Sequence, residues 1–112
     1  MVKESKLEIG LINLSILHTS ASLFVQENAS EDVLLDISDF LNTLVPQSFK
    51  YRHNMEGPDD MPAHIKSLLT NSNLTFSIEN NTIILGRWQG IYLYEHRTGE
   101  RTRAVIVHLI GS

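Results

Sequence analysis

The spacing of apolar residues changes along this chain, and that change limits the possible folds more than any other sequence feature. Between residues 33 and 45, apolar side chains recur every three or four positions, as in a helix that buries one face. In most of the remaining chain they alternate with polar residues, as in a strand that buries one face. The sequence therefore predicts an α+β fold, in which a mostly antiparallel β-sheet carries two helices on one face.

Residue types that begin and end helices define the two helices. Asn28 and Ser30 are alternative caps for the start of the first helix, and Pro46 ends it because proline lacks a backbone N–H. A loop follows, and Asp59 or Asp60 can cap the start of a second, shorter helix. The middle of the chain is therefore expected to run helix, loop, helix.

Strand patterns occupy both ends of the chain. The first strand, 7–18, is expected to end with His18 on its apolar face. After the second helix, four strands are expected to form a meander: 74–79, 82–86, 88–97 and 103–110. Asn80 and Asn81 can adopt the positive φ of a two-residue hairpin turn. The segment 103–110 is apolar on both faces, which predicts a central strand.

Length, charge and composition restrict the domain organisation and the partners. The 112 residues are expected to form one domain, 1–112, and a net charge of −4 with scattered Lys and Arg argues against a nucleic-acid surface. No stretch is long and apolar enough to cross a membrane, and the first residues do not resemble a signal peptide. The absence of cysteine excludes disulfides, thiolate nucleophiles and cysteine-type zinc sites. We expect a cytoplasmic protein.

Side chains that can bind a metal ion concentrate in residues 51–66, which hold two histidines, one glutamate and two aspartates. Neutral imidazoles bind divalent ions such as zinc, so His18, His53 and His64 are candidate ligands of a site with an open fourth position. No HxH, HxxxH or HExxH pairing is present, so the fold itself must bring these three residues together.

The carboxylates of this loop have two possible roles. Glu56, Asp59 and Asp60 could act as a general base, as metal ligands, or as partners that hold an imidazole in place. The alternative is a solvated acidic loop in which one aspartate caps the helix. No GxSxG motif or dinucleotide-binding fingerprint is present, so acyl transfer and hydride transfer are unsupported.

Two further groups could meet an anionic substrate. The small hydroxyl residues around Ser20 can bond phosphate oxygens, although a kink in a strand explains them equally well. Arg97 belongs to a set of arginines that flank a predicted turn near the C-terminus, where exposed arginines are common.

Five separated motifs give the chain a recognisable likeness. They are HTSAS at 18–22, QENA at 26–29, YRHN at 51–54, GPDDMPAHIK at 57–66 and WQGIYL at 88–93. In this order and spacing, from about Gly10 to Gly111, they resemble the YjbQ family, whose members are often labelled secondary thiamine-phosphate synthase enzymes.

The resemblance implies a compact α+β fold, assembly as a homotrimer and a bound divalent metal, with zinc as one candidate. It also implies a weak ability to make thiamine phosphate from its pyrimidine and thiazole phosphate precursors, as a side reaction beside an unsettled physiological one. The metal ligands would be the three histidines named above. The general base would be one of Glu27, Asp59 and Asp60, and Ser20, Asn28, Arg87 and Arg97 would contact a small phosphorylated metabolite. The alternative is a non-catalytic homotrimeric binding protein whose histidines and aspartates order the loop.

The chain departs from the family pattern in two places. Members usually carry about twenty or more residues before the equivalent of Leu7, and that lead is nearly absent, so we expect an exposed sheet edge and a weakened trimer. Arg87 stands where the family usually has Thr before Trp-Gln, so Arg87 is expected near solvent or an anion.

Overall fold

The computed structural model describes residues 1–112. Nine helices and strands follow one another along the chain: α1 (Val2–Ser5), β1 (Ile9–Ile16), β2 (Ala21–Glu27), α2 (Glu31–Leu44), α3 (Asp60–Leu69), β3 (Asn73–Glu79), β4 (Thr82–Ile83), β5 (Gln89–Glu95) and β6 (Val105–Gly111). All strand pairings are antiparallel, so the predicted α+β class is confirmed.

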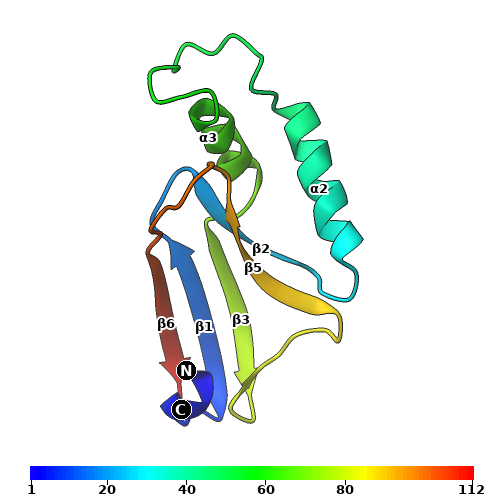
Figure 1. The fold of residues 1–112 in the computed structure, drawn as a ribbon. Helices are drawn as coiled ribbons and strands as arrows, with labels where there is room; N and C mark the ends of the chain where they lie inside the picture. Colours follow the sequence, from blue (N-terminus) through cyan, green and yellow to red (C-terminus); the bar gives the residue numbers. More distant parts are fainter.

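The strands form two sheets that lie end to end (Figure 1). The larger sheet has the order β4-β3-β1-β6, and β2 pairs with β5 in a two-stranded sheet, called here the β2–β5 ribbon. Helices α2 and α3 lie at the end of the molecule that holds this ribbon, away from the chain termini. The loop between the two helices therefore lies far from most of the large sheet.

The predicted four-strand meander is wrong, and so is the central position of the last strand. After the β3–β4 hairpin the chain leaves the large sheet, because β5 pairs with β2 instead. The last strand, β6, returns to pair with β1 and forms an edge, while β1 is central. The second apolar face of β6 is an exposed face that includes Ile106 and Ile110.

Local signals were more reliable than the strand order. Asn80 and Asn81 adopt φ of 52° and 57°, as predicted for the hairpin turn between β3 and β4. Helix α2 ends just before Pro46, as predicted. Ser30 and Asp59 occupy the positions that precede α2 and α3, but neither side chain caps its helix by a hydrogen bond. The Asp59 carboxylate is used elsewhere, as described below.

The buried core is small, and the molecule is extended. Only 14 of 112 residues are buried, and the main cluster joins Ile16 of β1 to Ala21 and Leu23 of β2. The radius of gyration is 16.4 Å, against about 13 Å for a compact domain of about 100 residues. Many large apolar side chains consequently remain exposed, among them Leu11, Phe40 and Ile110. No helix is long and apolar enough to span a membrane.

Candidate functional site

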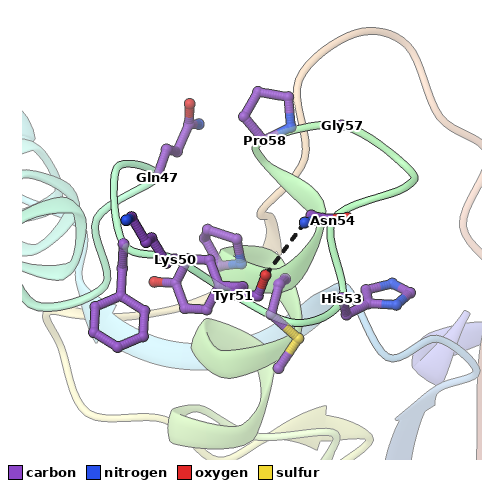
Figure 2. A pocket seen from close by; sticks show the side chains of 10 residues that line it. Gln47, Lys50, Tyr51, His53, Asn54, Gly57 and Pro58 are labelled. Atoms are coloured by element: carbon purple, nitrogen blue, oxygen red, sulfur yellow. Dashed lines mark hydrogen bonds between the residues drawn. The ribbon is translucent and has the colours of Figure 1, made fainter.

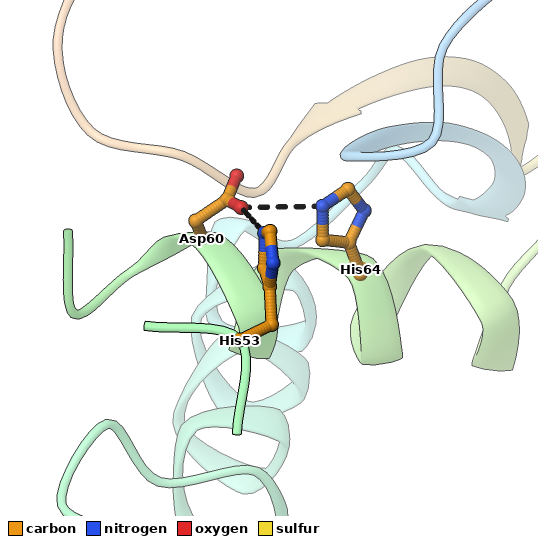
Figure 3. A group of neighbouring side chains, drawn as sticks. All are labelled: His53, Asp60 and His64. Atoms are coloured by element: carbon orange, nitrogen blue, oxygen red, sulfur yellow. Dashed lines mark hydrogen bonds and ion pairs between the residues drawn. The ribbon is translucent and has the colours of Figure 1, made fainter. Parts of the chain in front are cut away.

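The start of α3 and the loop before it gather two histidines and one aspartate into a cluster (Figure 3). The ligand atoms of His53, Asp60 and His64 all lie within 4.8 Å of one another. Asp60 and His64 are four residues apart on α3, a spacing that places both on one face of the helix. His53 comes from the loop and faces them. We call this group the His53–Asp60–His64 cluster.

Asp60 is the centre of the cluster. Its Oδ2 lies 2.7 Å from Nε2 of His53 and 3.3 Å from Nε2 of His64, and its Oδ1 lies 3.3 Å from Nη1 of Arg97. Only 3% of Asp60 is exposed. Burial alone would raise the pKa of Asp60, but the hydrogen bond to His53 and the charges of His64 and Arg97 hold it below its ordinary value. The hydrogen bond to Asp60 in turn raises the pKa of His53.

The backbone before β2 fixes the orientation of His64. The Nδ1 atom of His64 lies 2.9 Å from the carbonyl oxygen of Thr19, and a carbonyl oxygen can only accept, so Nδ1 carries a hydrogen. In the neutral ring, Nε2 then has a free lone pair that faces the carboxylate oxygen of Asp60. A cation bound between these two electron-rich atoms would stabilise both. In metal sites the other ring nitrogen of a ligating histidine commonly donates a hydrogen bond that orients the ring, as Nδ1 of His64 does here.

Asp59 lies next to this cluster but has different partners. Its carboxylate accepts hydrogen bonds from the backbone N–H and the hydroxyl of Thr98 and from the guanidinium of Arg97. The Thr98 N–H, followed by Arg97, lowers the pKa of Asp59 to about 2. A carboxylate with so low a pKa is a poor proton acceptor at neutral pH. Its geometry favours a role in holding the end of β5 against α3.

Arg97 is committed to this same network. Its Nη2 donates to the carbonyl oxygen of Glu56 over 2.7 Å, and its other nitrogens face Asp59 and Asp60. A phosphate could bind Arg97 only by displacing one of these partners. Glu56 differs, because its side chain is 62% exposed and one oxygen lies 3.0 Å from Nε2 of His53.

His18 lies outside the cluster. Its Nε2 accepts a hydrogen bond from the backbone N–H of Ala104 over 3.1 Å. Together with His64 it lines a hollow of about 380 Å³ that runs along α3 as far as Ser72. The structure therefore brings together two of the three predicted histidines, with Asp60 beside them.

The remaining predicted residues lie elsewhere. Ser20 is buried before β2, where its carbonyl oxygen accepts from the backbone N–H of His96 and from Arg103. Glu27 ends β2, seven residues after Ser20, which corresponds to about 20 Å along an extended strand. Asn28 donates to the backbone of Gln89 at this far end, and exposed Arg87 lies 4.7 Å from the ring centre of Trp88.

A cavity of about 480 Å³ opens beside His53 (Figure 2). Ten residues from the loop and the start of α3 line it: Gln47, Phe49, Lys50, Tyr51, His53, Asn54, Gly57, Pro58, Met61 and Pro62. The loop is held by the hydroxyl of Tyr51, which donates to the carbonyl oxygen of Pro46 over 2.7 Å. The volume of this cavity falls in the range of small-molecule sites, about 300–1,000 Å³.

Sequence reasoning did not single out Asp60 together with His64, although a signal was present. The spacings that commonly mark a metal site join two histidines, whereas the pair here is an aspartate followed by a histidine four residues later, in a helix. The lining residue Lys50 carried no signal, because a single exposed lysine in a loop is common.

Comparisons with known proteins find the same likeness over the whole chain. A family model described as UPF0047 protein YjbQ-like matches residues 1–112. A UPF0047 protein of Synechocystis sp. is 48% identical over 112 residues, which cover 99% of this chain and 76% of that protein. The UPF0047 protein YjbQ of Escherichia coli O157:H7 is 42% identical over 106 residues, covering 95% of this chain and 77% of that protein.

Solved structures have the same fold. A crystal structure of an uncharacterised YjbQ/UPF0047 family protein from Clostridium acetobutylicum is 37% identical, with a TM-score of 0.89 over 97% of this chain and 81% of that one. A YbjQ-like protein of unknown function from Sulfolobus solfataricus has a TM-score of 0.90 over 99% of this chain and 79% of that one, at 21% identity. The second match supports the fold alone.

Proposed function

The chain belongs to the UPF0047 YjbQ-like family, and on that premise we propose that it is a metal-dependent enzyme acting on a phosphorylated small molecule. Family membership by itself assigns no reaction. The observation that supports a metal-dependent reaction is the His53–Asp60–His64 cluster, whose ligand atoms lie within 4.8 Å of one another.

We assign His53, His64 and Asp60 as the ligands of a divalent ion. Two imidazoles and one carboxylate suit several such ions, zinc among them, and leave coordination positions open for substrate. His53 is half exposed, so the cluster is open to solvent on one side. Asp60 replaces His18 as the third ligand, because Nε2 of His18 accepts a hydrogen bond from the backbone. A divalent ion held there would act as a Lewis acid toward a phosphoryl or carbonyl oxygen.

Residues around the cluster would bind substrate and move a proton. Among the nearby carboxylates, Glu56 is the exposed one that contacts His53, so it is our candidate for the general base. Asp59 and Arg97 position Asp60 and the start of α3. Lys50 lines the cavity beside His53, and its ammonium group suits a phosphate, whereas the lining residues Phe49, Tyr51 and Met61 suit a ring.

The reaction to test first is the formation of thiamine phosphate from its pyrimidine and thiazole phosphate precursors, as a side activity. We further propose that the enzyme is cytoplasmic, which the absence of cysteine supports, and that it works as a homotrimer. The small core and the exposed apolar side chains support self-association. Glu27, Asn28 and Arg87 lie far from the cluster within one chain, so a role in catalysis would require a neighbouring subunit to bring them there.

Metal content tests this function directly. Purified protein loaded with zinc and dialysed should retain about one ion per chain, and the His64→Ala variant should lose it. The matched control is His18→Ala, which should retain the ion because His18 is outside the cluster. Equal metal content in the wild type and His64→Ala would contradict the ligand assignment. Formation of thiamine phosphate from the pyrimidine and thiazole phosphate precursors should fall with the metal content.

A non-catalytic homotrimeric binding protein remains the second candidate, because one observation favours it. Asp59, Arg97 and Thr98 satisfy one another without any ion, so the acidic loop is ordered by the protein alone. Two results together would favour a binding protein over an enzyme. The melting temperature would not change when zinc or a chelator is added, and the protein would not form thiamine phosphate.

A further inference from the structure

The hollow of about 380 Å³ beside His64 borders the metal-binding cluster. Segments just after β1 and just before β3 supply three of its lining residues, His18, Thr19 and Ser72, and α3 supplies the other five, Met61, His64, Ile65, Ser67 and Leu68. We call it the His18 hollow. His53 lines the cavity of about 480 Å³ described above, and Met61 lines both, so the cluster lies between the two.

The lining of the His18 hollow contains no lysine, arginine, aspartate or glutamate. The other cavity differs in this respect, because Lys50 lines it. The carboxylate of Asp60 lies 3.3 Å from Nε2 of His64, but His53 and Arg97 already engage it. An ionised group in the hollow would find no opposite charge among the lining residues, and burying an unpaired charge costs far more free energy than burying a neutral polar group. The hollow therefore suits an uncharged group.

His18 has one polar atom that no protein group uses. The backbone N–H of Ala104 donates to Nε2 of His18 over 3.1 Å, so Nε2 holds a lone pair and the neutral ring carries its hydrogen on Nδ1. This contact is the only hydrogen bond of the ring. The Nδ1 hydrogen is therefore available to a ligand in the hollow that His18 lines.

Hydroxyl groups give the hollow further hydrogen-bonding capacity. The hydroxyl of Ser67 donates to the carbonyl oxygen of Ala21 over 3.0 Å, so it can only accept from a ligand. The hydroxyls of Thr19 and Ser72 have no partner in the protein, so each can donate or accept. The rest of the lining, apart from the two histidines, is apolar: Met61, Ile65 and Leu68.

A carbonyl oxygen matches this set of groups. It is uncharged and has two lone pairs, so it can accept from Nδ1 of His18 and from a hydroxyl at the same time. A ring nitrogen has one lone pair and can accept from only one of them. The volume of about 380 Å³ lies at the lower end of the range for small-molecule sites, roughly 300–1,000 Å³, so a single ring with its carbonyl substituent fits.

We propose that the His18 hollow is a second substrate subsite of the metal centre and binds an uncharged carbonyl group, whose oxygen accepts the Nδ1 hydrogen of His18. This inference rests on the proposed function, because the hollow serves a reaction only if the adjoining cluster does. The phosphate lies in the cavity that Lys50 lines, and the carbonyl group lies on the other side of the cluster. The physiological substrate is then a phosphorylated compound that contains, or reacts with, an amide or a ketone.

The affinities of metal-free protein for benzamide, benzoate and benzylammonium test the preference for an uncharged carbonyl group. The three compounds share a ring and differ in the attached group, which is a neutral amide, an anion or a cation at pH 7. Benzamide should bind at least about fivefold more tightly than either of the others in NMR titrations. The same order should hold in Lys50→Met, which alters only the cavity on the other side of the cluster.

Two variants of His18 separate donation to a ligand from the contact with Ala104. An asparagine places its amide nitrogen where Nδ1 lies and is too short to reach Ala104, whereas a glutamine reaches the position of Nε2 and has no polar atom at Nδ1. His18→Asn should therefore keep most of the affinity for benzamide, and His18→Gln should lower it at least about fivefold. If His18 only supports Ala104, the order is reversed, and that result overturns the inference.

The ring resonances of the histidines report where benzamide binds. Benzamide should shift the signals of His18 and His64, which line the hollow, and leave those of His96 and His108 unchanged. Burial, and then the charge of Lys66, lower the pKa of His96 to about 4, so its ring is neutral at pH 7 and its signals do not depend on small changes of pH. If neither His18 nor His64 responds, the ligand lies elsewhere and the inference is wrong.

Failure of this inference and failure of the proposed function give different results. A wild type that retains no zinc after loading contradicts the proposed function, whatever its affinity for benzamide. A wild type that retains zinc but binds the three compounds equally overturns only the carbonyl subsite. His18→Gln should retain as much zinc as the wild type, because His18 lies outside the cluster.

Discussion

His64 donates a hydrogen bond from Nδ1 to the carbonyl oxygen of Thr19, over 2.9 Å. This contact joins α3 to the turn before β2 and directs Nε2 toward Asp60. We therefore predict that His64 in metal-free protein carries its neutral hydrogen on Nδ1, as ¹⁵N NMR of the ring nitrogens would show. Adding zinc should then move the Nε2 resonance. His108, exposed on β6, should show no such preference and is the control. A neutral His64 ring with its hydrogen on Nε2 in place of Nδ1 would contradict the proposed ligand atom.

Replacing Asp60 separates its electrostatic role from its structural one. In Asp60→Asn, the pKa of His53 should fall toward its ordinary value of 6.5, because the hydrogen bond that raises it loses its charge. An NMR titration of metal-free protein measures this pKa. Zinc affinity should fall by more than the roughly 10–100-fold that follows loss of an outer hydrogen-bond partner. Asp39→Asn on the exposed surface of α2 is the matched control, and it should change neither quantity.

Asp59 should contribute to stability only above acidic pH. Its pKa is lowered from 3.8 to about 2 in the folded protein, so its contribution is present above pH 3.8 and is lost as the pH falls toward 2. At pH 7 the free energy of unfolding of Asp59→Asn should be about 1–3 kcal/mol lower than that of the wild type, because Thr98 and Arg97 lose a charged acceptor. The difference between the two proteins should shrink between pH 4 and pH 2 in urea denaturation. A constant difference would exclude this carboxylate as its source.

The sequence was informative where neighbours along the chain decide the structure. The spacing from Val33 to Leu44 and the stop at Pro46 predicted α2 because a helix is held by contacts within four residues. The turn at Asn80 and Asn81 was predictable because few residue types tolerate positive φ.

Strand partners depend on contacts that the chain order does not display. The pairing of β5 with β2 joins segments separated by more than sixty residues, and the sequence pattern of neither strand identifies its pairing partner. The apolar outer face of β6 was taken for a sign of a central strand, whereas it is exposed at the edge. For the same reason, Asp60 could be proposed only as one of three carboxylates beside the histidines, and its place between His53 and His64 could not be chosen from the sequence.

His96 should make folding stability depend on pH in a different range. Because its folded pKa is lowered to about 4 from 6.5, the unfolded chain binds a proton more readily between these values. Stability from this group is complete above pH 6.5 and declines as the pH falls to 4, with a slope of at most about 1.4 kcal/mol per pH unit. His96→Phe should flatten this part of the stability profile in urea denaturation. An unchanged profile would show that His96 binds a proton as readily in the folded protein as in the unfolded chain.

The exposed face of the large sheet is where self-association should be most sensitive to charge. On this face Leu11 lies opposite Ile110, the polar pair Asn13 and His108 comes next, and Ile106 lies opposite Ser15, so exposed apolar side chains alternate with polar ones on the β1–β6 side. A glutamate at Ile106 would have to be desolvated in any interface that covers this side. It should have little effect on the fold itself, because half of the Ile106 side chain is already exposed.

We predict that the wild type sediments as a trimer and that Ile106→Glu shifts it toward the monomer, with an unchanged circular dichroism spectrum. Thr102→Glu, which adds the same charge to an exposed loop before β6, should remain trimeric. Analytical ultracentrifugation over a range of concentrations distinguishes these outcomes. A monomeric wild type would remove self-association from the proposal, and a trimeric Ile106→Glu would place the interface elsewhere, with the exposed α2 residues Phe40 and Leu44 as the next surface to test.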